Sequence, residues 1–202
     1  MSDCLVKVGA VASAPAAWQT VRMHVLTPHP TTGPTPVDRI EVQIERLGEV
    51  GLKLRYQVFG DLTRLKPPDF ERAGRTEGLW RSTCFEAFVK PEGGEGYLEC
   101  NFAGLQWATY RFSGYREGMA EAAVEPWVIE GSLRDGSLAI EIGPGRFARP
   151  DLPAPAWLVG LSAVIEDIDG GISYWALAHP PGKPDFHHPD SFALTLPPPE
   201  PA

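Results

Sequence analysis

Short runs in which apolar and polar residues alternate one by one fill most of this chain, and turn residues separate the runs. The clearest pair of runs lies at residues 39–46 and 50–58, with Leu47, Gly48 and Glu49 between them. A period of two is typical of a β-strand that buries one face, and two such runs joined by a short turn predict a hairpin. The 21 glycines and 21 prolines lie singly or in short clusters between the runs, which favours many turns and short strands.

Similar runs predict further strands at residues 16–26, 82–90, 97–102, 106–112, 124–130, 137–142, 156–166, 172–178 and 191–196. The first is expected at a sheet edge, and Asp135-Gly136 predicts a hairpin turn. In the long connection at 60–78, the segment DFERAGR (residues 69–75) has room for one helical turn. About nine to eleven strands predict an all-β, two-sheet antiparallel β-sandwich, jelly-roll-like in type. One domain is expected over residues 16–196, with an N-terminal segment at 1–15 and a proline-rich tail at 197–202.

A formal net charge of −8 without any basic run disfavours a nucleic-acid surface, which needs cations against phosphates. No apolar stretch approaches the ~20 residues of a membrane-spanning helix, so no membrane partner is expected. The three cysteines match no zinc-binding spacing and favour reduced thiols in a reducing compartment. The N-terminal VGAVASAPAAW only weakly resembles a secretory signal, because it lacks a positive start and a strong apolar centre, and a cytoplasmic location is therefore expected. No feature of the sequence identifies a protein partner.

Residues 79–112, LWRSTCFEAFVKPEGGEGYLECNFAGLQWATYRF, place charged side chains on predicted strands. If a turn occupies residues 91–96, Lys90 lies opposite Tyr97, and this register decides which side chains share a face. It brings three polar side chains to one face: Glu86, Glu99 and Asn101. Cys84 then lies on that face and Cys100 on the other, so the two thiols cannot form a disulfide. If the next turn, at residues 103–105, keeps odd-numbered residues on the same face of both strands, Trp107, Thr109 and Arg111 would also lie on this face.

Carboxylates, an amide, a guanidinium and an indole on one surface suit a sugar, since polar groups meet hydroxyls while a flat ring covers the apolar face of a pyranose. The alternative is a solvated outer face with an Arg–Glu pair across strands. Two carboxylates also raise the hypothesis of a glycoside-acting enzyme that uses Glu86 and Glu99. That role requires one raised pKa, for which the sequence holds no sign.

Histidines and prolines crowd the segment AHPPGKPDFHHPDSF, which predicts a stiff, shaped loop. His179, His187 and His188 are expected to be structural or to line a ligand, because their spacings do not suit a metal site. Haem is the alternative cofactor, with Met119 and a loop histidine as the conceivable axial pair. The sequence has no GxSxG elbow, and Gly93 to Gly96 predict a turn rather than a phosphate cradle.

Three segments together resemble the DOMON-like proteins related to type 9 carbohydrate-binding modules: LWRSTCFEAFV, YLECNFAGLQWATYRFSGYREGM and LVGLSAVIEDIDGGISYWALAHPPGKPDFHHPDSFALTL. The resemblance covers roughly residues 24–196. It rests on the order and context of six residues: Trp80, Glu86, Tyr97, Glu99, Trp175 and Phe192. It implies a two-sheet antiparallel sandwich that binds a sugar or, in some branches, haem.

The resemblance further implies that Trp80 and Trp175 sandwich a sugar end, with Glu86 and Arg111 holding hydroxyls. The asparagine expected close to the second tryptophan is absent, since Ser173 and Tyr174 stand there, and no acidic calcium loop is evident. The resulting prediction is a non-catalytic module that binds a carbohydrate or a similar small polar ligand, with no cofactor. The alternatives are a haem-binding redox module, a glycoside-acting enzyme and a protein-interaction domain without a small ligand.

Overall fold

The computed structural model describes residues 21–134, 137–147 and 156–198, and this part of the chain is built from strands and loops. Its short 3-10 helices are η2 (Leu62–Arg64), η3 (Leu79–Arg81) and η4 (Pro189–Ser191). The strands are β1 (Met23–Pro28), β2 (Val37–Leu47), β3 (Gly51–Gly60), β4 (Gly74–Arg75), β5 (Cys84–Pro91), β6 (Tyr97–Ala103), β7 (Gln106–Phe112), β8 (Ala120–Glu121), β9 (Ile129–Arg134), β10 (Ser137–Arg146), β11 (Trp157–Glu166), β12 (Ile172–Ala176) and β13 (Leu194–Leu196). The all-β prediction is confirmed.

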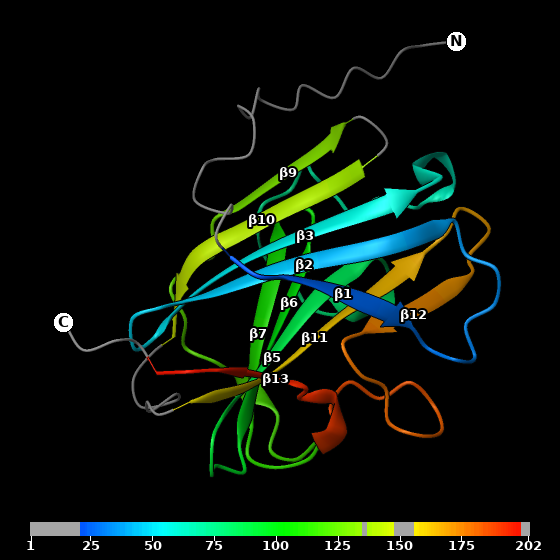
Figure 1. The fold of residues 1–202 in the computed structure, drawn as a ribbon. Helices are drawn as coiled ribbons and strands as arrows, with labels where there is room; N and C mark the ends of the chain where they lie inside the picture. The colour runs from blue at the N-terminus through cyan, green and yellow to red at the C-terminus, as the bar shows by residue number, and fades with distance from the viewer. Residues whose placement is uncertain (1–20, 135–136, 148–155, 199–202) are drawn as a thin grey trace.

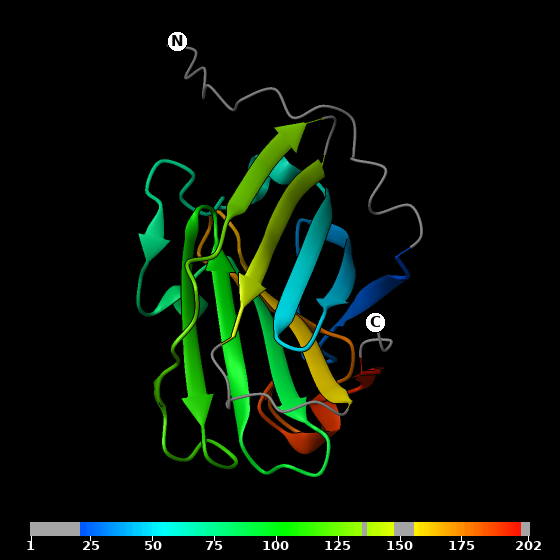
Figure 2. The same cartoon turned by 90° about the vertical axis from the view of Figure 1, so that its left-hand side faces the viewer.

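The strands form one continuous curled sheet in the order β4-β7-β6-β5-β11-β12-β1-β2-β3-β10-β9, with β13 beside β11 and β8 beside β7. The strand β1 joins the two halves, because Met23 to Leu26 pair with β2 while Thr27 and Pro28 pair with β12. In Figure 1 the half that contains β2, β3, β10 and β9 lies in front of β5, β6, β7 and β11, and Figure 2 shows both halves from the side. The first strand is therefore not at an edge, and the sheet is one curled surface rather than two separate sheets.

The main core lies between the two halves and draws its side chains from both. The inward positions of β2 and β3 are those of the sequence alternation, and Ile40, Val42, Leu54 and Val58 are fully buried there. Tyr56 of β3 crosses the core, and its hydroxyl donates a hydrogen bond of 2.7 Å to the main-chain carbonyl of Glu86 in β5. A second, smaller cluster of buried residues lies on the outer face of β5, β6 and β7 and includes Leu79, Phe88 and Phe112.

The register predicted for the central strands is confirmed, since Phe88 pairs with Glu99 and Glu86 with Asn101. Cys84 and Cys100 accordingly project from opposite faces, and both are buried free thiols. Cys4 lies outside the described residues. The hairpin predicted at Asp135-Gly136 is also confirmed, because Arg134 pairs with Ser137, although residues 135–136 themselves are not described.

The prediction that the odd-numbered residues of β7 share a face with Glu99 is wrong. Ala103 pairs with Gln106, so the connection contains two residues, Gly104 and Leu105, and the even-numbered residues of β7 share the face of Glu99. The tight turn is tied to a distant loop, because the Leu105 N–H donates to the Asp69 carbonyl at 3.1 Å. The odd-numbered residues therefore lie on the opposite face: Trp107, Thr109 and Arg111.

Other differences occur where loops pair with strands. The helical turn allowed at DFERAGR, residues 69–75, does not form; the Asp69 carboxylate accepts hydrogen bonds from the main-chain N–H groups of Glu71 and Arg72, and the helical turn in this connection is η2 instead. The chain then runs as β4, parallel to β7. The last strand is shorter than predicted, since the 3-10 helix η4 occupies its expected start.

Candidate ligand-binding site

A cavity of about 550 Å³ opens on the outer face of the half-sheet that contains β5, β6, β7, β11 and β12. Strands form its floor, and its walls come from η3 and from the loops at residues 113–119 and 177–188. The volume is within the range of small-molecule sites. The lining residues are Trp80, Glu86, Phe88, Glu99, Tyr110, Phe112, Arg116, Met119, Val164, Tyr174, Pro184, Phe186 and His187.

Two glutamates form the polar floor. Glu86 is 3% exposed, and its Oε2 accepts a hydrogen bond of 3.1 Å from the Ser162 hydroxyl. Glu99 is 6% exposed, and its Oε1 accepts one of 2.7 Å from the Asn101 amide. The antiparallel register places the two carboxyl groups as diagonal neighbours on β5 and β6, within reach of a single ligand group.

Burial changes the protonation of this floor. Burial, followed by the negative charge of Glu99, raises the pKa of Glu86 to about 8. Burial also raises the pKa of Glu99, while the hydrogen bond from Asn101 opposes the rise. At neutral pH Glu86 therefore holds its proton most of the time, and the pair presents both a donor and acceptors to the cavity.

His187 forms one wall and is neutral. Burial, with the charge of Arg116 second, lowers the pKa of His187 to about 4. The Tyr97 hydroxyl accepts a hydrogen bond from the Arg116 main-chain N–H and lies 2.8 Å from His187 Nδ1. The other ring nitrogen, Nε2, lies 3.7 Å from Glu99 Oε2.

Arg116 is held in an unusual conformation beside the cavity. Among the described residues it is the one non-glycine with a positive φ, at 56°. Its guanidinium donates to Asp185 at 2.7 Å, which ties the loop at 113–119 to the loop at 177–188. Strained backbone of this kind persists where surrounding contacts hold it, and it concentrates at binding sites.

Aromatic side chains form the rest of the surface. Trp80 stands at the mouth with 38% of its surface exposed, and its ring lies edge-to-face on Tyr110 with centroids 5.9 Å apart. Phe88, Phe112 and Phe186 contribute further apolar walls. A flat indole beside a polar floor is an arrangement that can hold the apolar face of a ring while its polar groups are hydrogen-bonded.

The structure brings together part of the predicted site. Trp80, Glu86, Glu99 and His187 line the cavity, and fully buried Asn101, beside Glu99 on the same face of β6, donates a hydrogen bond to it.

Four predicted residues lie elsewhere. Arg111 is on the opposite face and borders a different hollow, of about 430 Å³, beside the turn after β5. Trp175 is packed in the main core with 3% exposed, and its Nε1–H donates to the Ser173 hydroxyl at 3.0 Å. His179 Nε2 bonds to the carbonyl of Thr27, and His188 caps η4. None of these four lines the cavity.

Sequence reasoning missed Tyr110, Arg116, Tyr174 and Phe186 as lining residues. A two-residue turn after β6 would have placed Tyr110 opposite Glu99, and the turn length was the available signal. Arg116 had no local signal, because its partner Asp185 lies 69 positions away in the chain.

The residues around the cavity do not fit a haem. Met119 and His187 both line it, but the two ring nitrogens of His187 face Tyr97 and Glu99, so neither is directed at an axial position. Within the described residues, no group of three or more His, Cys, Asp or Glu side chains is placed to hold a metal ion. No helix in this part of the chain has the length and apolar character needed to cross a membrane.

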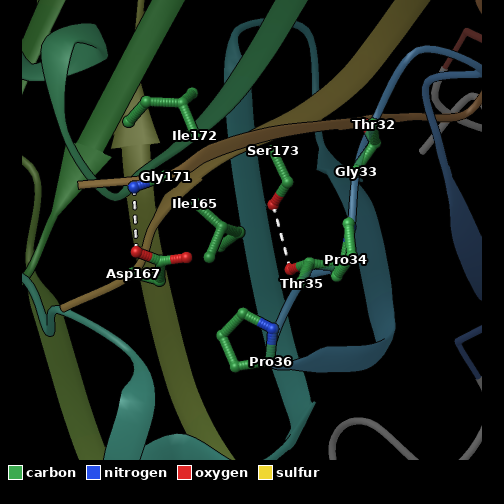
Figure 3. Close-up of a pocket in the computed structure, with 10 residues that line it drawn as sticks. All are labelled: Thr32, Gly33, Pro34, Thr35, Pro36, Ile165, Asp167, Gly171, Ile172 and Ser173. Atoms are coloured by element: carbon green, nitrogen blue, oxygen red, sulfur yellow. Dashed lines mark hydrogen bonds between the residues drawn. The ribbon is translucent and has the colours of Figure 1, made fainter. Parts of the chain in front are cut away.

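A smaller hollow of about 160 Å³, shown in Figure 3, lies between the loop at residues 32–36 and the turn after β11. Several of its polar groups are already bonded to one another, since the Thr35 and Ser173 hydroxyls lie 3.3 Å apart and Asp167 Oδ1 accepts from the Gly171 N–H at 2.8 Å. It is also below the usual size of a small-molecule site. The larger cavity is therefore the better candidate.

Comparisons with known proteins place the fold. No protein-family model and no curated protein sequence matches this chain. The structure is similar to a candidate carbohydrate-binding protein from Bacteroides uniformis, with a TM-score of 0.58 and 14% identity over 85% of this chain and 84% of that chain. It is also similar to a family 9 carbohydrate-binding module from Caldicellulosiruptor kristjanssonii in complex with glucose, with a TM-score of 0.50 and 11% identity over 88% of this chain and 86% of that chain. At these identities the likeness establishes a shared fold, which confirms the resemblance to type 9 modules at that level.

Proposed function

We propose that this protein binds a carbohydrate in the cavity on its outer half-sheet and does not cleave it. The observation that carries the proposal is the pair of buried glutamates, Glu86 and Glu99, at the floor of an open cavity with aromatic walls. Buried polar groups need partners, and the hydroxyls of a sugar supply both donors and acceptors. Trp80, exposed at the mouth, supplies the flat surface for a ring.

The structural neighbours support this function. One of them is a type 9 module in complex with glucose, and the other is named as a candidate carbohydrate-binding protein. A closer relation to the DOMON-like proteins, with their jelly-roll sandwich, belongs to the same proposal and rests on the sequence contexts of Trp80, Glu86 and Glu99. The platform differs from the one implied by that resemblance, because Trp175 is buried and Tyr110 stands beside Trp80 instead.

Calorimetric titration with mono- and disaccharides tests the proposal. We expect Trp80→Ala and Glu99→Gln each to weaken the tightest sugar by about tenfold, because one removes the ring platform and the other a charged acceptor. Arg111→Gln is the matched control, since the sequence predicted Arg111 as a sugar-binding residue but the side chain lies on the opposite face. The affinity of this variant for the sugar should equal that of the wild type.

Three outcomes would contradict the proposal. The site is misplaced if Arg111→Gln weakens binding while Trp80→Ala does not. No sugar binding below millimolar concentration would remove the carbohydrate function. Chromatography of each sugar after prolonged incubation checks for cleavage, and products that disappear in Glu86→Gln would favour the glycoside-acting enzyme.

A further inference from the structure

Resting on the carbohydrate-binding function proposed above, we propose that the ligand is an amino sugar with a free, unacetylated amino group, whose ammonium binds at the floor of the cavity between Glu86 and Glu99. Three features of the cavity favour an ammonium: the carboxylate oxygens that are not hydrogen-bonded, the charges around them and the surrounding aromatic rings.

Each floor glutamate has one oxygen in use and one available. Ser162 occupies Oε2 of Glu86, and no described residue donates to its Oε1. Asn101 occupies Oε1 of Glu99, and the nearest basic nitrogen to its Oε2 is His187 Nε2 at 3.7 Å, beyond hydrogen-bond distance. Both residues line the cavity, so two acceptors on adjacent strands are open to the same ligand group. An ammonium supplies three donors from one atom and suits this pair.

The charges around the floor leave an excess of negative charge. The titratable groups that line the cavity or bond to its lining are Glu86, Glu99, Tyr97, Tyr110, Arg116, Tyr174, Asp185 and His187, with Cys84 beside Glu86, Arg75 over the Tyr110 ring and Arg81 over the Trp80 ring. Arg116 is already paired with Asp185 at 2.7 Å and Arg75 with Glu77 and Glu121. Arg81 lies beside Trp80 at the mouth rather than at the floor, and His187 is neutral. Ionising both floor glutamates in a largely buried site therefore requires a new positive charge. A neutral sugar cannot provide it, and an acidic sugar would increase the repulsion.

The walls also favour a cation. Trp80 and Tyr110 stand on one side of the floor, and Phe88 and Phe112 lie beside the glutamates. The faces of such rings attract ammonium groups, most strongly where water is excluded. His187 also lines the cavity, so its ring is a further polar partner for hydroxyls of the same sugar.

Proton release gives the inference a distinctive signature. Without ligand, burial and the charge of Glu99 keep the pKa of Glu86 near 8, so Glu86 is protonated at pH 6.5. An amine is an ammonium at that pH, and its binding would lower the pKa of Glu86 and expel about one proton per ligand.

The test uses three β-1,4-linked disaccharides of the same shape: glucosamine disaccharide, its N-acetylated form and cellobiose. Each is titrated calorimetrically at pH 6.5 in phosphate and in imidazole, whose different ionisation heats report protons released. We expect the glucosamine disaccharide to bind at least about tenfold tighter than the other two, with release of about one proton. Glu86→Gln should reduce this preference to about threefold or less and abolish the release, with Arg111→Gln as the unchanged control. Glu99→Gln serves as the second variant if Glu86→Gln fails to fold, and it should lower the same preference.

The outcomes separate this inference from the proposed function. Equal or tighter binding of cellobiose, or of the N-acetylated form, overturns the amino-sugar inference and leaves carbohydrate binding in place. No binding of any of the three overturns both. Cyclohexylamine serves as an amine with a ring but no hydroxyls, and binding as tight as that of the glucosamine disaccharide would contradict recognition of a sugar.

Discussion

At the residue scale, the chemistry of Glu86 is decided by what covers it. On a solvated sheet face the side chain would be an ordinary carboxylate, but loops close over this face and leave it 3% exposed. Burial and the nearby charge of Glu99 raise the pKa of Glu86 to about 8. The protein thus maintains a carboxylic acid at neutral pH, and ligand binding can use or displace its proton.

This raised pKa predicts a dependence of stability on pH. Unfolded Glu86 releases its proton near pH 4.5, whereas folded Glu86 keeps it until about pH 8, so the folded state binds more protons between these values. The contribution of Glu86 to the free energy of unfolding is complete below pH 4.5 and decreases as the pH rises to 8.

Urea unfolding of the wild type and of Glu86→Gln at pH 5.5, 7 and 8.5 measures this effect. As the pH rises from 5.5 to 8.5, we expect the wild type to lose a few kcal/mol of unfolding free energy relative to Glu86→Gln. The loss is about 1.4 kcal/mol for each pH unit below the pKa of folded Glu86. The comparison with Glu86→Gln removes the effect of titrating groups that do not interact with Glu86, and the remaining difference belongs to Glu86 together with Glu99, whose charge acts on it. A difference that does not change with pH would show that Glu86 ionises normally.

At the element scale, a two-residue turn determines which residues of β7 reach the site. Gly104 has a φ of 62°, and a Cβ atom there would lie 1.8 Å from the carbonyl oxygen of Asp69. The loop before β4 therefore packs directly on this turn, and the short connection places Tyr110, rather than Arg111, over the face of Glu99.

Gly104→Ala should destabilise the protein by about 3 kcal/mol or more, because it adds a steric clash with main chain to the cost of a left-handed conformation. Gly93→Ala is the matched control, since Gly93 has a φ of 77° with no atom within 4 Å of the added Cβ, and about 1 kcal/mol is expected. Chemical denaturation monitored by tryptophan fluorescence measures both. Similar losses at the two positions would show that contact with Asp69 does not constrain the turn.

At the scale of the whole molecule, the main core lies between the two halves of the curled sheet, so residues of one half contact the strands that carry the site on the other. The Tyr56 hydroxyl of β3 bonds to the carbonyl of Glu86, and its ring lies 5.0 Å from that of Phe85. The floor of the cavity is thus supported from behind by a residue of the other half.

Tyr56→Phe should lower the free energy of unfolding by about 1 to 3 kcal/mol, because a buried carbonyl loses its donor without the loss of a ring. Unfolding should remain a single transition, since both halves contribute to the same core. Tyr174→Phe is the control, as no hydrogen bond of its hydroxyl is found among the described residues. Two separate transitions, or equal losses in the two variants, would contradict this account of the core.

The amino-acid sequence by itself determined the position of most long strands and how β5 and β6 pair, because alternation and a short turn act between near neighbours. It therefore placed Glu86, Glu99 and Asn101 on one face and the two described cysteines on opposite faces. Only the tertiary structure decided what that face meets. Which residues of β7 face the cavity depends on a hydrogen bond between the main chains of Leu105 and Asp69. The walls of the cavity depend on the contact between Arg116 and Asp185, 69 positions apart. Local pattern orients a side chain relative to its neighbours, whereas contacts between distant segments decide whether that side chain lies in solvent, in the core or in a cavity.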